Sequence, residues 1–207
     1  MATTTTISQV GEFPLISSMV GDLTMGQAVT LGPGDDGAVF QVDGSAVVST
    51  DVLVEEVHFR RRWSTATDVG RKAVAVNVSD IEAMGAVPVA LVVGFSAPGD
   101  LPASWAREFM AGMTAESQKA GVSVVGGDTT GGPVVSIAVT VIGQTAGMAP
   151  VRRDGAVPGD EVAVIGQLGL AAAGLALLGR GFRSPRAVVA AQRCPEVPYG
   201  QGRVAAK

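Results

Sequence analysis

Two adjacent carboxylates, Asp35 and Asp36, stand in the glycine-rich stretch Gly32–Phe40. Its three glycines match the pattern G-x-G-x-x-G, but that dinucleotide fingerprint opens a helix, whereas Ala38–Val42 alternates like a strand. The protein-kinase version of the pattern also fails, because no V-A-I-K, H-R-D or D-F-G segment follows. A carboxylate about 4 Å from a phosphate is repelled by about 4 kcal/mol at an effective dielectric of about 20. The stretch is therefore interpreted as a turn that holds divalent cations, through which it can meet a polyphosphate.

Three further aspartates stand in similar settings. Asp51 ends an apolar run, Asp80 follows Asn77-Val-Ser, and Asp128 follows two glycines. For any one Asp in a glycine-rich turn, ordinary turn chemistry is the commoner explanation. Four such positions in a chain that is only 16% charged favour a shared role in holding metal.

Composition limits the class of protein. The 207-residue chain is 47% hydrophobic and contains 28 glycines, which suits one or two folded domains with a substantial core. Its net charge of −4 and pI of about 5.0 argue against nucleic acid or an anionic membrane as a partner. The single cysteine, Cys194, excludes an internal disulfide framework and fits a reducing compartment. Because the first residues lack the basic region and apolar core of a signal peptide, we expect a cytoplasmic protein.

The hydrophobic pattern predicts an α+β sandwich, in which a mixed sheet carries helices on one face. The dipeptide Asp43-Gly44 is typical of a two-residue turn and predicts that its flanking strands form a hairpin. Apolar stripes that end at glycine predict two long helices, and continuous apolar runs predict buried strands. The expected elements are the helix Glu12–Val20, the strands Ala38–Val42 and Ser45–Asp51 (continuing to Val54), the helix Thr67–Met84 capped by Thr67, the strand Val87–Ser96, the helix Ser104–Ala120, and the strands Val122–Val125 and Val134–Ile142.

Two polar features leave alternatives open. Asn77 and Asp80 are three positions apart and share one face of the helix predicted over Thr67–Met84. Such a pair on a mainly apolar helix either faces solvent or points at a site. His58 is the only histidine and has aromatic and apolar neighbours. A lone histidine in that setting is more often structural than catalytic, and both roles stay open.

Composition changes at Gly143–Pro158, which is rich in Gly, Pro and Arg and predicts a domain junction. We expect a first domain at residues 1–145 and the beginning of a second domain at residues 146–207. The second part opens with a predicted strand at Glu161–Ile165 and a predicted helix at Leu168–Leu178, and then runs into Pro- and Gly-rich turns. About 60 residues are few for an independent core, so this second domain is expected to be truncated.

Five short motifs follow one another along the chain: Gly34–Asp36, Ser49–Leu53 with Glu56–Phe59, Asn77–Asp80, Gly126–Thr129, and Arg152–Ala156 with Pro158–Asp160. In this order they resemble the front portion of the thiamine-monophosphate kinases. That family belongs to a superfamily with aminoimidazole ribonucleotide synthetase and selenophosphate synthetase. Each motif alone is weak, but the five together are specific and cover residues from about 12 to 180. The position of His58 after the Ser-Thr-Asp strand is most similar to the thiamine branch.

The resemblance implies transfer of the γ-phosphoryl group of ATP to thiamine monophosphate, which gives thiamine diphosphate and ADP. It places the substrate contact at His58 and the ATP contacts at Gly127, Asp128 and Arg153. Arg153 and Asp51 are the residues expected to act on the transferring group. The implied magnesium ligands are Asp36, Ser49, Thr50, Asp51, Asp80 and Asp128.

This chemistry is physically coherent. The acceptor is already an anionic phosphate oxygen, so it needs no general base. Two anions must be brought together, which calls for Mg²⁺ held by carboxylates and shared with the phosphates. Arg153 can stabilise the charge of the transferring group, and Gly127 allows the backbone to approach the nucleotide. The resemblance also implies a homodimer formed by residues 12–145.

Two departures from the family pattern are visible. No Asp-x-Ser-Asp-Gly motif follows Arg180, and Met110 stands where relatives often have an aromatic residue that contacts the nucleotide. Two alternatives therefore remain beside the thiamine reaction. The chain is either another ATP-using member of the superfamily, which activates an amide or a selenide, or a truncated remnant that binds nucleotide or only dimerises.

Overall fold

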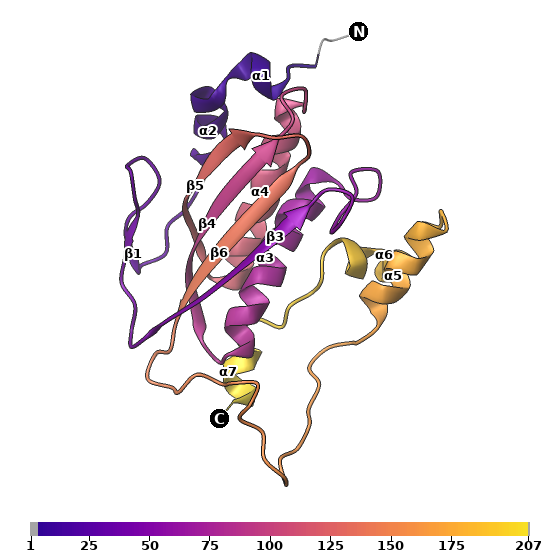
Figure 1. Cartoon of the computed structure of the whole chain (residues 1–207). Helices are drawn as coiled ribbons and strands as arrows, with labels where there is room; N and C mark the ends of the chain where they lie inside the picture. Colours follow the sequence, from indigo (N-terminus) through magenta and orange to yellow (C-terminus); the bar gives the residue numbers. More distant parts are fainter. Residues whose placement is uncertain (1–3, 207) are drawn as a thin grey trace.

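The computed structural model describes residues 4–206 and places four strands in one mixed sheet of order β3-β6-β4-β5 (Figure 1). β6 lies between β3 and β4 and is antiparallel to both, while β4 and β5 are parallel. The predicted α+β architecture, with helices on one face of a mixed sheet, is confirmed. The strands are β3 Ala46–Val54, β4 Val87–Ala97, β5 Ser123–Gly131 and β6 Ser136–Gln144.

Two 18-residue helices, α3 Ala66–Ala83 and α4 Ala103–Ala120, pack on one face of this sheet (Figure 1). α3 begins after Thr65, whose hydroxyl accepts a hydrogen bond from the Asp68 N–H at 3.1 Å. The Asp68 carboxylate in turn accepts one from the Thr65 N–H at 3.0 Å. This reciprocal capping box satisfies two otherwise unpaired donors. The prediction of Thr67 as the cap is therefore wrong, because Thr67 already lies in the first turn.

The two long helices cross with their backbones in contact at Gly70 and Gly112. A Cβ atom on Gly70 would lie 2.0 Å from the carbonyl oxygen of Phe109. A Cβ atom on Gly112 would lie 2.3 Å from the carbonyl oxygen of Thr67. Because the neighbouring atoms belong to the backbone, no side chain fits at either position. The two glycines therefore set the distance between α3 and α4.

The core lies between the sheet and this helix layer. Phe95 of β4 stacks with Trp105 and Phe109 of α4, with ring centroids 6.3 and 5.4 Å apart. The opposite face of the sheet carries no helix among the described residues. On that face the side chains of Val48 and Val52 remain 60% and 46% exposed.

The segment before the central sheet forms a separate two-stranded sheet of β1 Val29–Leu31 and β2 Val39–Phe40. The predicted hairpin across Asp43-Gly44 is wrong, because β2 pairs with β1 whereas β3 pairs with β6 along its whole length. The dipeptide still turns the chain, since Gly44 has a φ of 78°. The Asp43 N–H then donates to the side chain of Gln144 on β6 at 2.7 Å.

From residue 4 onward, two helices precede this small sheet, α1 Ile7–Val10 and α2 Glu12–Val20. α2 has the bounds predicted from the sequence and packs against α4 and β5 (Figure 1). Its residues Leu15 and Met19 are buried in the core. The helix therefore forms one wall beside the β5 edge of the central sheet.

Between β6 and residue 206 the structure contains three helices, α5 Leu170–Gly179, α6 Arg186–Arg193 and α7 Gln201–Ala205. α5 confirms the helix predicted at Leu168–Leu178. The strand predicted at Glu161–Ile165 is wrong, because these residues are exposed and pair with no strand among the described residues. The prediction of turns after Arg180 is also wrong, since α6 and α7 lie there. Between residues 4 and 206, no helix is long and apolar enough to cross a membrane.

The segment that carries α7 docks on the helix layer through backbone groups. Glu82 of α3 accepts hydrogen bonds from the N–H groups of Gly200 at 2.8 Å and Gly202 at 3.3 Å. Arg203 donates to the carbonyl oxygens of Thr145 at 2.8 Å and Ala146 at 2.6 Å. α7 is thereby held against both the end of α3 and the segment that follows β6.

Tyr199, the single tyrosine of the chain, reports on this docking because its hydroxyl donates to the buried Glu116 at 2.9 Å. Burial and this hydrogen bond raise the pKa of Tyr199. A raised pKa in the folded state means that the phenol stabilises the fold below its ordinary pKa of about 10, and that this stability is lost as the pH rises toward the folded-state value. Ultraviolet difference spectra at about pH 11 should show no phenolate in the folded protein and extensive phenolate in denaturant. Phenolate that forms at about pH 10 without unfolding would contradict the docking.

Candidate functional site

A pocket of about 300 Å³ opens along β5 at the edge of the sheet. Side chains of α2, β4, α4 and β5 form an apolar wall. The loop at residues 33–38 forms the other wall and carries Asp35 and Asp36. The pocket therefore joins an apolar surface, which suits a flat ring, to an acidic end. The apolar wall includes Met19, Val93, Phe95, Phe109, Met110 and Val124.

The Gly-Gly-Asp motif lies inside β5 and not in the predicted turn. Gly127 and Asp128 are in register with Val93 and Gly94 of β4. A Cβ atom on Gly127 would lie 2.1 Å from the carbonyl oxygen of Val93, so the close neighbour that requires a glycine here is the β4 backbone. Asp128 lines the same pocket as Asp36. The structure thus brings these two predicted ligands to one cavity.

A second polar group lies where β3 meets α3. The Ser49 hydroxyl donates to Asp80 Oδ2 at 2.8 Å, and the Asp51 N–H donates to Asn77 Oδ1 at 3.0 Å. Asn77 is fully buried, and its amide also donates to the carbonyl oxygen of Ala73 at 2.8 Å. Asn77 therefore holds the β3 backbone at Asp51. Of this pair, Asn77 points at the β3 backbone while Asp80 is exposed to solvent, so a site at this helix face stays a prediction.

Thr50 lies between Ser49 and Asp51 but faces the other way. Successive side chains of a strand point to opposite faces of the sheet. The Thr50 hydroxyl donates to the carbonyl oxygen of Val139 at 3.1 Å and accepts from the Thr140 hydroxyl at 3.0 Å. The side chain of this predicted ligand is therefore separated by the sheet from the group at α3.

The width of the sheet separates the two acidic groups. Asp51 of β3 is in register with Val139 of β6, which is in register with Val93 of β4 and, through it, with Gly127 of β5. Three strand spacings place the two edges about 14 Å apart, whereas the oxygen ligands of one Mg²⁺ lie about 2.1 Å from the ion. Accordingly, no three acidic, histidine or cysteine side chains of residues 4–206 converge on one metal-sized site. Within one chain, the predicted ligands form two groups.

The predicted substrate residue, His58, lies in the exposed loop after β3 and outside the pocket at β5. Its Nδ1 accepts a hydrogen bond from the Val54 N–H at 3.0 Å. In the neutral ring the proton is therefore on Nε2, which stays available to another partner. Lys72 Nζ donates to the carbonyl oxygen of His58 at 2.9 Å, and burial lowers the pKa of Lys72. The His58 ring thus accepts a backbone hydrogen bond at Nδ1 and keeps its Nε2–H group as a donor for a ligand.

Glu56, in the same loop, has a φ of 66°, which strains a residue that carries a Cβ atom. Its carboxylate pairs with Arg60 at 3.1 Å and Arg62 at 2.7 Å, but exposed pairs of this kind contribute little. We expect Glu56→Gly to be more stable than Glu56→Ala by about 1 kcal/mol in urea denaturation, because only glycine relieves the strain. Because both variants lose the ion pairs, the difference between their stabilities reports only the strain in the backbone at residue 56. Equal stability of the two would show that this conformation is not strained.

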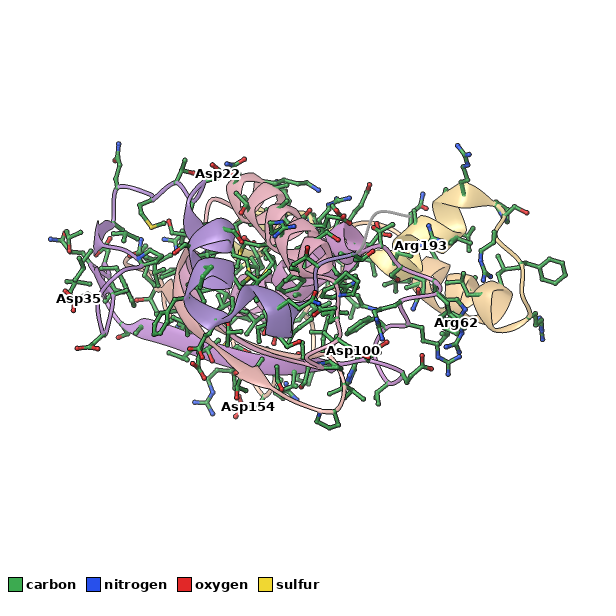
Figure 2. The ribbon with its side chains drawn as sticks, turned by 90° about the horizontal axis from the view of Figure 1, so that it is seen from above. Asp22, Asp35, Arg62, Asp100, Asp154 and Arg193 are labelled. Carbon is green, nitrogen blue, oxygen red and sulfur yellow. The ribbon has the colours of Figure 1, made fainter. Side chains whose placement is uncertain are left out.

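Arg153 lies in the exposed segment after β6. Its neighbour Arg152 is paired with Asp154 at 2.7 Å, whereas Arg153 itself forms no ion pair with any residue in the described range 4–206. Figure 2 labels Asp154 well apart from Asp35, which marks the acidic loop. Arg153 does not line the pocket at β5 together with Asp36 and Asp128.

A profile of the family described as AIR synthase related protein, N-terminal domain, matches residues 34–145. This range runs from the acidic loop to the end of the central sheet and contains every predicted site residue except Arg153. The chain belongs to the AIR synthase related family.

Individual relatives carry a more specific name. The thiamine-monophosphate kinase of Mycobacterium tuberculosis is 46% identical over 202 residues, which are 97% of this chain and 61% of that protein. The crystal structure of thiamine monophosphate kinase from Aquifex aeolicus superposes with a TM-score of 0.74 at 29% identity and covers 93% of this chain and 63% of its own. The structure of AaThiL complexed with AMPPCP and TMP gives a TM-score of 0.68 at 30% identity and covers 97% and 63%. The chain thus spans less than two thirds of the length of the relatives that it matches.

Proposed function

We propose that the intact protein is a thiamine-monophosphate kinase, which transfers the γ-phosphoryl group of ATP to thiamine monophosphate. The observation that carries this proposal is 46% identity over 97% of this chain to a relative of that name. The structure of AaThiL with AMPPCP and TMP supports the pair of substrates. This chain spans 61% of the length of the M. tuberculosis relative. The proposal therefore concerns the activity of the whole protein and not of these 207 residues alone.

The pocket at β5 supports the binding of ATP. Its apolar wall, which includes Phe109 and Met110, suits the adenine ring. Met110 is 6% exposed, and its polarizable thioether can contact an aromatic ring in place of the side-chain stacking expected in relatives. The acidic end, with Asp36 and Asp128, suits phosphates only when divalent cations lie between the charges.

The donor chemistry of both acidic groups fits Mg²⁺, which prefers oxygen ligands and commonly binds one or two carboxylates together with substrate phosphates. Asp36 and Asp128 would hold it at the pocket, and Ser49, Asp51 and Asp80 would hold it at the junction of β3 and α3. Bound Mg²⁺ supplies positive charge that offsets the repulsion between the donor and acceptor phosphates.

The residues of this chain orient the reactants and need not move a proton, because the acceptor oxygen is already anionic. Asn77 fixes the β3 backbone and thereby positions Asp51. His58 keeps Nε2 for a hydrogen bond to the acceptor. Arg153 can stabilise the transferring group when the segment after β6 approaches the pocket.

The activity is tested by incubating the intact protein with ATP, Mg²⁺ and thiamine monophosphate and separating the products. We expect equal amounts of thiamine diphosphate and ADP, and neither product without Mg²⁺. Asp128→Asn should lower the turnover number by about 100-fold, the size typical of losing one charge-stabilising group. Asp100→Asn, in an exposed loop, is the control and should leave turnover unchanged. ATP use that depends on an amide or a selenide acceptor instead would overturn the assignment.

The part of the sheet face around β3 that carries no helix within residues 4–206 supports a homodimer formed by residues 12–145. Val48 and Val52 are large apolar side chains exposed there, and a second copy would bury them. Sedimentation equilibrium at micromolar concentration should give the mass of a dimer. Val52→Lys should give a monomer, because it places a charge in the interface, whereas Val162→Lys, at a side chain that is 97% exposed elsewhere, should not. A monomeric wild-type protein would contradict the proposal.

We also propose that residues 1–145 form a first domain, which makes the nucleotide, metal and dimer contacts. Residues 146–207 are proposed to begin a second domain. The family match, which ends at residue 145, supports this division. The acidic net charge supports a protein without a nucleic-acid or membrane partner. The single cysteine supports a cytoplasmic location.

A further inference from the structure

A second pocket, of about 500 Å³, lies between α3 and α6. Figure 2 places Arg193, at the end of α6, on the opposite side of the molecule from Asp35. Guanidinium groups dominate the lining of this pocket. The four arginines that line it are Arg71, Arg183, Arg186 and Arg193.

One of the four arginines is already paired. Arg71 Nε donates to the buried Glu116 at 2.9 Å, and this hydrogen bond raises the pKa of Arg71. Arg183, Arg186 and Arg193 take part in none of the ion pairs among residues 4–206. Three guanidinium groups are therefore not neutralised by a carboxylate partner.

The other polar groups of the pocket do not cancel this charge. Asp68 caps α3, where its carboxylate accepts the Thr65 N–H at 3.0 Å. Burial raises the pKa of Cys194 to about 11, so its thiol is neutral at physiological pH. Glu196 is exposed and is the remaining carboxylate of the lining. Asp68 and Glu196 both keep their charge, so three arginines that are unpaired within residues 4–206, against two carboxylates, leave the pocket with one excess positive charge.

Arg193 adds a buried donor that the chain does not satisfy. Its Nε atom is shielded from solvent and has no hydrogen-bond partner among the described residues. Leaving such a group unpaired destabilises the protein, and more so when the group is charged. A ligand oxygen at Arg193 would recover this energy. The planar fork of arginine matches the oxygens of a phosphate, which can accept two hydrogen bonds from one guanidinium.

We propose that this arginine pocket binds a metal-free phosphoryl group, as free phosphate, as diphosphate or on a phosphate ester. Its chemistry is the reverse of the acidic pocket at β5, which meets phosphate only through a divalent cation. Because the two pockets lie on opposite sides of the molecule, the arginine pocket is an anion site separate from the proposed transfer reaction.

Calorimetric titration in metal-depleted buffer at constant ionic strength tests this site with inorganic phosphate and with diphosphate. The wild-type protein should bind each at one saturable site per chain, and diphosphate more tightly because it carries more charge. Arg183→Gln and Arg186→Gln change exposed side chains. Each should weaken Kd about tenfold, which corresponds to about 1.4 kcal/mol and to one charge-assisted hydrogen bond. Arg107→Gln, an exposed arginine of α4, is the matched control and should leave Kd unchanged.

Circular dichroism should first show that each variant is folded. No saturable binding of either anion by the wild-type protein at concentrations up to about 10 mM would overturn the proposal. Equal weakening by Arg107→Gln would also overturn it, because the attraction would then be unspecific. The titration contains neither Mg²⁺ nor nucleotide, so its outcome is independent of the kinase assay and of Asp128.

Discussion

Gly70→Ala should lower the free energy of unfolding by about 2–3 kcal/mol, a size typical of overpacking in a tight core. The added Cβ atom would lie 2.0 Å from the Phe109 carbonyl oxygen and 2.8 Å from the Met113 nitrogen. Both are backbone atoms of α4, so the clash is relieved only when α3 and α4 move apart. Alanine favours a helix over glycine by up to about 1 kcal/mol, which offsets only part of the loss.

Urea denaturation at fixed protein concentration measures this effect. Gly179→Ala, in α5, is the matched control, because a Cβ atom there meets nothing within 4 Å, and it should be neutral or slightly stabilising. Gly112→Ala acts on the same crossing and should cause a similar loss. The double variant should lose less than the sum, since helices separated by the first methyl group leave room for the second. A Gly70→Ala protein within about 0.5 kcal/mol of wild type would refute the direct backbone contact.

Local signals in the sequence predicted the elements that flank the site. The continuous apolar run at Val87–Ser96 predicted β4, which is buried on both faces over Pro88–Leu91 and alternates between buried and exposed residues from Leu91 onward. The apolar stripe through Trp105 and Phe109 predicted α4, and its end at Gly121 is confirmed by a left-handed φ of 68°. These signals depend only on residues a few positions apart.

Strand pairing was less predictable, because the partner of a strand can lie anywhere along the chain. The turn at Asp43-Gly44 exists, but β3 pairs with β6 and not with the strand before the turn. Gly126–Thr129 has the composition of a turn, yet it lies in β5, where Gly127 permits close approach of the Val93 carbonyl group. Gly127 thus serves a contact with a strand that is distant in the sequence, whereas Gly44 permits the turn itself.

Only part of the candidate pocket could be predicted from the sequence, and its geometry could not. The motifs identified Asp36 and Asp128, which line one pocket. Alternation along β3 could have indicated that Thr50 faces away from Ser49 and Asp51. The separation of the acidic residues into two groups depends on the register through β6 and β4, which no local pattern contains.

Asp51→Asn should remove most of the stability that the protein gains from Mg²⁺ and a non-hydrolysable ATP analogue. At ligand concentrations of about 100 times Kd, the wild-type protein should gain about 2.7 kcal/mol by mass action. The Asp51 carboxylate is exposed at the junction of β3 and α3, where Ser49 links the strand to Asp80. Asparagine keeps the shape of the side chain and the backbone bond to Asn77 but lacks the charge. The variant should therefore fold and still lose the ligand-induced gain.

Without metal, we expect Asp51→Asn to change the stability of the protein in the opposite direction. Asp51 and Asp80 carry like charges on neighbouring elements, so Asp51→Asn should be as stable as wild type or slightly more stable in metal-depleted buffer. Thermal melts with and without Mg²⁺ and the nucleotide analogue separate the two effects. Asp36→Asn and Asp80→Asn should behave like Asp51→Asn, whereas Asp100→Asn, in an exposed loop, should follow wild type. Equal ligand-induced shifts in wild type and Asp51→Asn would show that Asp51 is an ordinary exposed residue of β3 and holds no metal.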